Sequence, residues 1–154
     1  MLTFLDGIIP ARFLLLCAYT IITIVAIYAR EANVIACMPA KYSSAEFSKK
    51  ELSIKSGYIA ALGLVIFELA GFVSGVSTFI PVTTVISILT HGIASIMMAS
   101  YVMFEWDCDF YWWIFIIGSI IPAFMEIFSL ISMLFLWSAW GISRLRYSAS
   151  RSSM

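Results

Sequence analysis

The segment from Gly57 to Ile80, GYIAALGLVIFELAGFVSGVSTFI, is the feature that most constrains how this chain can fold. It is apolar throughout, except for small hydroxyl groups and one acid, Glu68, near its centre. At about 1.5 Å per helical residue it is long enough to cross a hydrocarbon core of roughly 30 Å. A carboxyl inside lipid is costly, so it faces a protein partner or a wet cavity. The segment therefore predicts a transmembrane helix with a buried acid.

The remaining sequence extends this prediction to four membrane spans. The chain is 62% hydrophobic and 12% charged, with a mean hydropathy of +1.01, whereas soluble domains carry about 25% charged residues. The apolar residues form four blocks, at about 13–29, 57–80, 82–104 and 110–138. We expect an all-α, polytopic four-helix bundle over residues 1–142 and a disordered tail over residues 143–154. Pro122 should bend or locally break the fourth span, since it removes one backbone donor.

Four spans place both termini on one side of the membrane, but the basic residues do not say which side. The terminal side carries Arg12, Arg144, Arg146 and Arg151, and the other side carries Arg30, Lys41, Lys49, Lys50 and Lys55. These counts are nearly equal, so the positive-inside rule leaves the orientation open. The net charge of zero argues against a nucleic-acid partner.

Three ionisable residues in the later spans are the candidate site. Measured from the predicted span ends at about 1.5 Å per residue, Glu68, His91 and Glu126 lie at similar depth, so we expect them to meet near the bilayer midplane. A hydrogen-bonded polar cluster between helices is the interpretation we favour. A small proton- or ion-coupled transporter or channel using the same residues is the alternative. No enzyme signature accompanies them, because the chain has one histidine and no C-x-x-C pair. We therefore expect no catalytic residue, metal, cofactor or small-molecule substrate.

Glycine spacing and a capping motif predict local packing. Gly71 and Gly75 form G-x-x-x-G after Glu68, a spacing that lets a neighbouring helix approach closely. Ser43 followed by Glu46 has the spacing of a capping box, which predicts a helix that runs from the first loop into the second span. A polar loop with a frayed helical turn is the alternative there.

Cys37 and Cys108 lie in the first and third loops, which four spans place on the same face of the membrane. If that face is lumenal or extracellular, an oxidising compartment can join the two thiols. If it is cytosolic, both stay reduced. Topology alone leaves the two outcomes open, since the sequence does not give the distance that a disulfide needs.

Several longer motifs resemble one known family. They are PARFL at Pro10–Leu14, ACMP at Ala36–Pro39, FELAGFVSGVS at Phe67–Ser77, the region of His91, FEWDCDFYWWIF at Phe104–Phe115 and IIPAFMEI at Ile120–Ile127. In this order and spacing they resemble the transmembrane protein 107 family over about residues 10–136. The resemblance implies a four-span, non-enzymatic protein of the ciliary transition zone, with both termini cytoplasmic.

Further expectations follow from the resemblance alone. The family belongs to the Meckel-syndrome module, a membrane-linked assembly that supports cilium formation and gates the composition of the ciliary membrane. The expected partners are tectonics and other transition-zone membrane proteins, besides the lipid bilayer. A cytoplasmic location of the termini also favours the Cys37–Cys108 disulfide.

Overall fold

The computed structural model of the chain describes residues 2–75 and 80–152, and this part folds as helices joined by short connections. The long helices are α1 (Leu2–Ala36), α2 (Ser44–Val73) and α3 (Pro81–Met103). A 3₁₀ turn, η1 (Cys108–Phe110), leads into α4 (Tyr111–Phe115), a π-helical turn η2 (Ile116–Ile120) and α5 (Ile121–Ser152). Four segments of the described chain are long and apolar enough to cross a membrane: Gly7–Ala36, Ser44–Val73, Pro81–Met103 and Cys108–Gly141. The predicted all-α, four-span architecture is confirmed.

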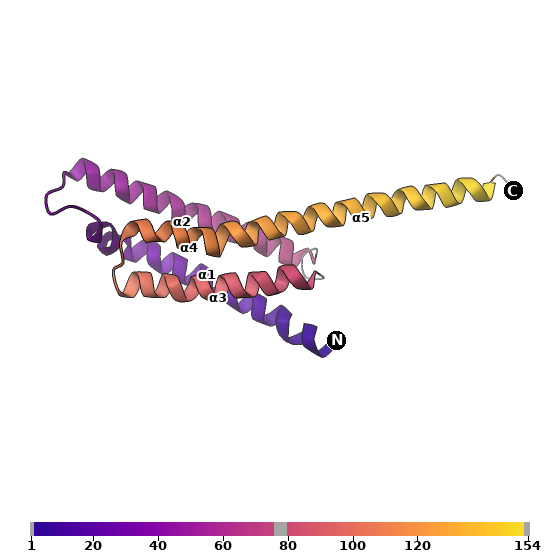
Figure 1. Cartoon of the computed structure of the whole chain (residues 1–154), viewed down its shortest axis with the longest axis horizontal. Coiled ribbons are helices and arrows are strands. Elements are labelled where there is room, and N and C mark those ends of the chain that lie inside the picture. Colours follow the sequence, from indigo (N-terminus) through magenta and orange to yellow (C-terminus); the bar gives the residue numbers. More distant parts are fainter. Residues whose placement is uncertain (1, 76–79, 153–154) are drawn as a thin grey trace.

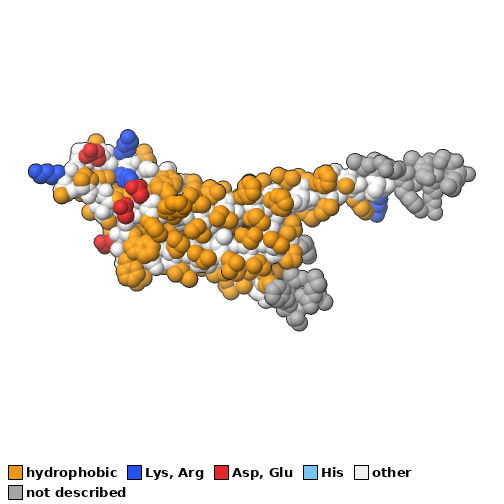
Figure 2. Space-filling model, viewed as in Figure 1, with side chains coloured by type: hydrophobic (Ala, Val, Ile, Leu, Met, Phe, Trp, Pro, Cys, Tyr) orange, Lys and Arg blue, Asp and Glu red, His pale blue; other side chains and the backbone are white. Residues whose placement is uncertain are grey.

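The helices form one elongated bundle (Figure 1). α2, α3 and the α4–α5 helix run along its length, and α1 crosses them at an angle while packing mainly on α3 and α2. The α1–α2 and α3–η1 connections lie at one end, here called the loop end. The α2–α3 connection lies at the opposite end, here called the hairpin end, together with the two ends of the chain. Figure 2 shows that apolar side chains cover the flank of the bundle, whereas charged side chains gather at the loop end.

Local sequence signals set where two of the helices begin. Ser43 caps α2 through a capping box with Glu46, in which each side chain accepts from the other residue's backbone N–H. The helix predicted for this part of the first loop is therefore confirmed, and α2 starts well before Gly57. Pro81 occupies the first turn of α3. Backbone N–H groups in the first turn have no acceptor within the helix, so a proline there costs no hydrogen bond.

The second span ends earlier than the apolar run that predicted it. α2 stops at Val73, not near Ile80, and Ser74 is its C-terminal cap. Gly75 follows with a φ of 78°, in the left-handed region that glycine enters without steric cost. Hydropathy shows which residues can lie in lipid, whereas backbone conformation determines where a helix ends. The end of the apolar run and the end of α2 therefore differ. Ser77, the last residue of the predicted FELAGFVSGVS motif, lies outside the described residues.

The fourth span contains the expected irregularity at Pro122. The proline cannot donate a hydrogen bond to the carbonyl of Gly118, and the helix widens into the π turn Ile116–Ile120 directly before it. Beyond the bundle α5 continues as a helix to Ser152. The tail that the sequence predicts to be disordered, residues 143–154, is helical in its described part, as far as Ser152. Once a helix exists, each residue added to its end gains a backbone hydrogen bond. Amino-acid composition does not reveal this contribution to helix stability.

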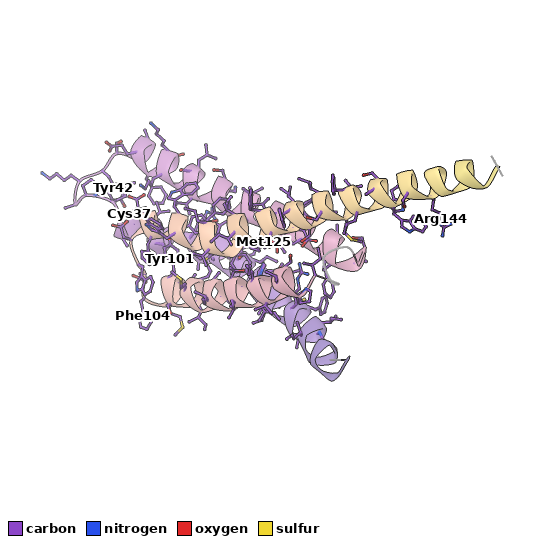
Figure 3. The ribbon with its side chains drawn as sticks, turned by 45° about the vertical axis from the view of Figure 1, so that its right-hand side comes forward. Cys37, Tyr42, Tyr101, Phe104, Met125 and Arg144 are labelled. Atoms are coloured by element: carbon purple, nitrogen blue, oxygen red, sulfur yellow. A yellow bond between two sulfur atoms is a disulfide. The ribbon has the colours of Figure 1, made fainter. Side chains whose placement is uncertain are left out.

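The loop end is held by contacts among distant segments. A disulfide joins Cys37, just after α1, to Cys108 in η1. Figure 3 shows Cys37 and Tyr101 gathered at this end of the bundle. Ion pairs join Arg30 to Glu51 at 2.6 Å and Lys50 to Asp109 at 2.7 Å. The loop end is thus cross-linked covalently and electrostatically, outside the apolar belt.

Candidate functional site: a buried charged cluster

Among the described residues, each of the four spans contributes one buried Arg, His or Glu side chain to the interior. They are Arg12 on α1, Glu68 on α2, His91 on α3 and Glu126 on α5, with exposed fractions of 2%, 0%, 1% and 0%. These four residues are called the buried charged cluster below. The three predicted site residues all point into the bundle, and the fourth member, Arg12, was expected outside the membrane.

Arg12 forms an ion pair with Glu126 across the bundle. Its Nη2 donates to Glu126 Oε2 at 2.9 Å, and its Nε donates to Ser87 Oγ at 3.2 Å. The guanidinium carbon also lies 5.6 Å from the centre of the Phe72 ring, within range of a cation–π contact. Counting Arg12 among the basic residues that flank the first span is therefore wrong. The α1 helix begins before it and carries it between the other helices.

Glu68 faces His91 rather than Glu126. His91 Nε2 lies 3.5 Å from Glu68 Oε2. On the other side of the ring, His91 Nδ1 lies 2.9 Å from the backbone carbonyl oxygen of Ser87, one helical turn earlier. The Tyr19 ring packs edge-on against the imidazole, with 5.4 Å between the ring centres. The imidazole is therefore fixed between a carbonyl, a carboxyl and an aromatic ring.

The four side chains form two adjacent layers and not one. Gly71 follows Glu68 by about 4.5 Å along α2, and a Cβ atom built on Gly71 would overlap the Glu126 carboxyl. Glu126 therefore lies one turn nearer the hairpin end than Glu68. Thr83 and Ser129, hydrogen bonded at 2.8 Å, close the bundle beyond it. Both predicted acids lie deep in the bundle, but each pairs with its own cation or imidazole.

The two glycines of the predicted G-x-x-x-G motif have different surroundings. Gly71 is buried and supplies the space that the Glu126 side chain occupies. Gly75 lies beyond the end of α2 with a positive φ, so no helical strip joins it to Gly71. The spacing is correct in the sequence, but the helix ends between the two residues. Gly75 therefore acts as a chain-turning residue in this structure and not as a helix-packing surface.

Replacing Gly71 by Ile should destabilise the bundle by about 3 kcal/mol, the upper range for overpacking a filled site. The added side chain would displace the Glu126 carboxyl from Arg12. Gly63 is a matched control on the same helix, because it is exposed and nothing lies within 4 Å of its missing Cβ. Thermal unfolding of both variants in lipid nanodiscs measures the difference. Equal unfolding temperatures for Gly71→Ile and Gly63→Ile would contradict the packing role of Gly71.

A seven-residue spacing along α1 could have revealed Arg12. Arg12, Tyr19, Ala26 and Asn33 follow one another at intervals of seven, and all four are buried. Such spacing keeps one side of a helix against its neighbours. Tyr19 donates to or accepts from Ser119 at 3.0 Å, and the Asn33 amide donates to the Tyr101 carbonyl at 2.8 Å. The inward side of α1 therefore carries polar groups at several depths, and Arg12 is the one nearest the hairpin end.

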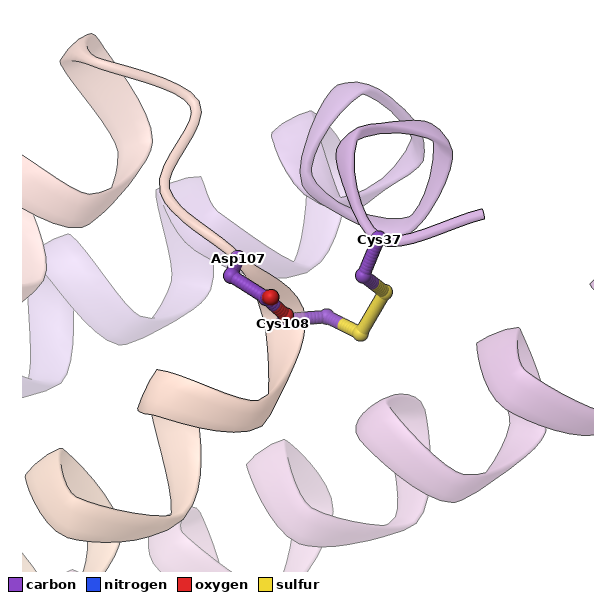
Figure 4. Close-up of side chains that lie close together, drawn as sticks. All are labelled: Cys37, Asp107 and Cys108. Atoms are coloured by element: carbon purple, nitrogen blue, oxygen red, sulfur yellow. A yellow bond between two sulfur atoms is a disulfide. The ribbon is translucent and has the colours of Figure 1, made fainter. Parts of the chain in front are cut away.

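The predicted cysteine pair lies at the loop end, away from the buried charged cluster. Cys37 and Cys108 are joined through their sulfur atoms, and the Asp107 carboxylate lies close by (Figure 4). Two thiolates and a carboxylate are a donor set that zinc accepts. The bonded sulfur atoms offer no thiolate, however, and Asp107 accepts from the Asp109 backbone N–H at 3.1 Å as the cap of η1. The geometry therefore fits a covalent brace between the two loops.

Comparisons with known proteins give the family of the chain. The TMEM107 family model, described as a transmembrane protein, matches residues 8–130. Transmembrane protein 107 of Rattus norvegicus is 38% identical over 122 residues, which cover 79% of this chain and 87% of that protein. The Homo sapiens protein of the same name is 36% identical over 121 residues, covering 79% and 86%. The Danio rerio protein is 35% identical over 128 residues, covering 83% and 95%. No solved structure matches. Because the family model and these relatives extend over most of the chain, it belongs to the TMEM107 family of transmembrane proteins.

Proposed function

We propose that this chain is a non-enzymatic membrane subunit of the ciliary transition zone, within the Meckel-syndrome module. In this role it supports cilium assembly and the gating of ciliary membrane composition. Membership of the TMEM107 family is the observation that carries the proposal. Its partners are tectonics and other membrane subunits of the same module. Both termini face the cytoplasm, so the loop end lies on the lumenal or extracellular side.

The pairing of the buried charges supports a structural role over a catalytic one. Arg12 joins α1 to α5, and His91 faces Glu68 between α3 and α2. Each member of the buried charged cluster thus faces a side chain from another span, which sets how the spans align. The relatives named above also carry no enzyme's name.

Localisation of a tagged full-length chain in a ciliated cell tests the proposal. We expect a narrow ring at the base of the cilium and co-purification of tectonics. A tag after Met154 follows a helix that extends beyond the bundle, so it leaves the bundle surface free. Uniform plasma-membrane signal without tectonic recovery would contradict the proposal. The same distribution accompanied by a proton or ion current would favour the transporter built on Glu68, His91 and Glu126.

A further inference from the structure

The hydrogen-bond geometry around His91 determines where one of its ring protons lies. The Ser87 carbonyl oxygen can only accept, and it lies 2.9 Å from His91 Nδ1. Nδ1 must therefore carry a hydrogen, because two lone pairs would otherwise face each other. Ser87 Oγ is more distant from Nδ1, at 3.4 Å, and it accepts from Arg12 Nε at 3.2 Å. The carbonyl contact therefore decides the tautomer.

With a hydrogen on Nδ1, the neutral imidazole presents a lone pair at Nε2. The group opposite is Glu68 Oε2 at 3.5 Å, and an ionised carboxylate also offers only lone pairs. The separation exceeds an ordinary hydrogen bond by a few tenths of an ångström, so the two atoms face each other within reach of a shared hydrogen. Without a proton between them this contact would be repulsive. The geometry therefore requires a second proton between Glu68 Oε2 and His91 Nε2, in addition to the hydrogen on Nδ1.

Counting the charges of the cluster leads to the same conclusion. Arg12 and Glu126 cancel each other as an ion pair. An ionised Glu68 beside a neutral His91 would leave one net negative charge in the interior, which is costly in a low-dielectric surrounding. Arg12 and Glu126 are the other two charged members of the cluster, while Tyr19 and Ser87 contact the imidazole. One added proton makes the four-residue cluster neutral.

The surroundings of Glu68 indicate which atom holds that proton. Within the described part of the chain neither Glu68 oxygen accepts a hydrogen bond, and His91 Nε2 has no hydrogen-bond partner either. A buried carboxylate is stable only when several donors surround it, whereas a carboxylic acid needs few. We propose that Glu68 and His91 form a proton-binding site inside the bundle, in which a protonated Glu68 faces the Nε2 lone pair of a neutral His91. The proton is structural, because it allows the α2 acid to pack against α3.

His91 is the only histidine of the chain, so nitrogen-15 labelling of histidine reports this site alone. The test uses NMR of the full-length protein in lipid bilayers between about pH 6 and pH 8, the range in which a free imidazole titrates. We expect one protonated nitrogen, assigned to Nδ1, and one unprotonated nitrogen, Nε2, throughout this range. Two protonated nitrogens would show an imidazolium and overturn the proposal. A hydrogen on Nε2 alone would overturn it as well.

Infrared spectroscopy locates the proton on the carboxyl side. At neutral pH the wild-type protein should show the C=O stretching band of a protonated carboxylic acid. Glu68→Gln should remove that band, and its amide can still donate to Nε2, so the variant should fold. Glu105→Gln is the matched control at an exposed acid and should leave the band intact. Absence of the band in the wild type, or its persistence in Glu68→Gln, would overturn the proposal.

Discussion

Replacing Arg12 by Met should destabilise the folded bundle by roughly 3–5 kcal/mol, the usual cost of removing one partner from a buried ion pair. The variant keeps the length of the side chain but leaves Glu126, which is fully buried, without its cation. It also removes the donor to Ser87 Oγ. The measurement is thermal unfolding of the purified protein in lipid nanodiscs, with tryptophan fluorescence as the signal.

A double replacement separates the lost pair from simple loss of packing. Arg12→Met combined with Glu126→Met removes both charges, so most of the stability should return, because apolar residues of similar volume often replace a buried pair without loss. Arg144→Met is the matched control. Its guanidinium lies 4.0 Å from the exposed Trp140 ring on α5, and an exposed contact of this kind contributes about 0.5–1 kcal/mol. A single Arg12→Met variant as stable as Arg144→Met would show that the ion pair contributes little.

Loss of the Cys37–Cys108 disulfide should have an effect of similar size. The bridge closes a chain segment with a sequence separation of 71 residues, for which the chain-entropy model predicts a stabilisation of about 4 kcal/mol. Cys37→Ser should therefore lower the unfolding temperature markedly. Cys108→Ser and the double variant should lower it to the same level, because each removes the same bond. Reductant should bring the wild-type protein down to that level too.

Cys17 provides the internal control for the disulfide. It is the free cysteine of the described chain, partly buried on α1, so Cys17→Ser should keep both the wild-type stability and its sensitivity to reductant. Mass spectrometry of the non-reduced protein should recover a peptide that links Cys37 to Cys108. Alkylation of both thiols in the native protein would contradict the bridge. It would also count against a lumenal or extracellular loop end, since an oxidising compartment is where such a bond persists.

Local signals determined most of the secondary structure. Four apolar blocks predict four spans, because a chain in lipid must satisfy its backbone groups within each helix. The capping box of Ser43 and Glu46, Pro81 at the start of α3 and the irregularity before Pro122 depend on neighbouring residues alone. Such features can be predicted from one sequence, since their physical causes act within a turn or two of the chain.

Only the tertiary structure decided which polar groups pair. Three ionisable residues could be placed at similar depth, but depth does not say which helices are neighbours or which side of each helix faces inward. The angle at which α1 crosses the bundle brings Arg12 to Glu126 and leaves His91 to Glu68. The end of α2 at Val73 likewise separates Gly75 from Gly71.

The sequence by itself thus determined the number of spans, their helical nature and the presence of buried charge. The partners of that charge depend on contacts between residues as far apart in the chain as Arg12 and Glu126. These contacts stabilise the protein only when the helices pack. The attraction within an ion pair that is excluded from water increases as the distance between its two groups decreases. No local pattern encodes that approach, so the arrangement of the buried charged cluster appears only in the folded bundle.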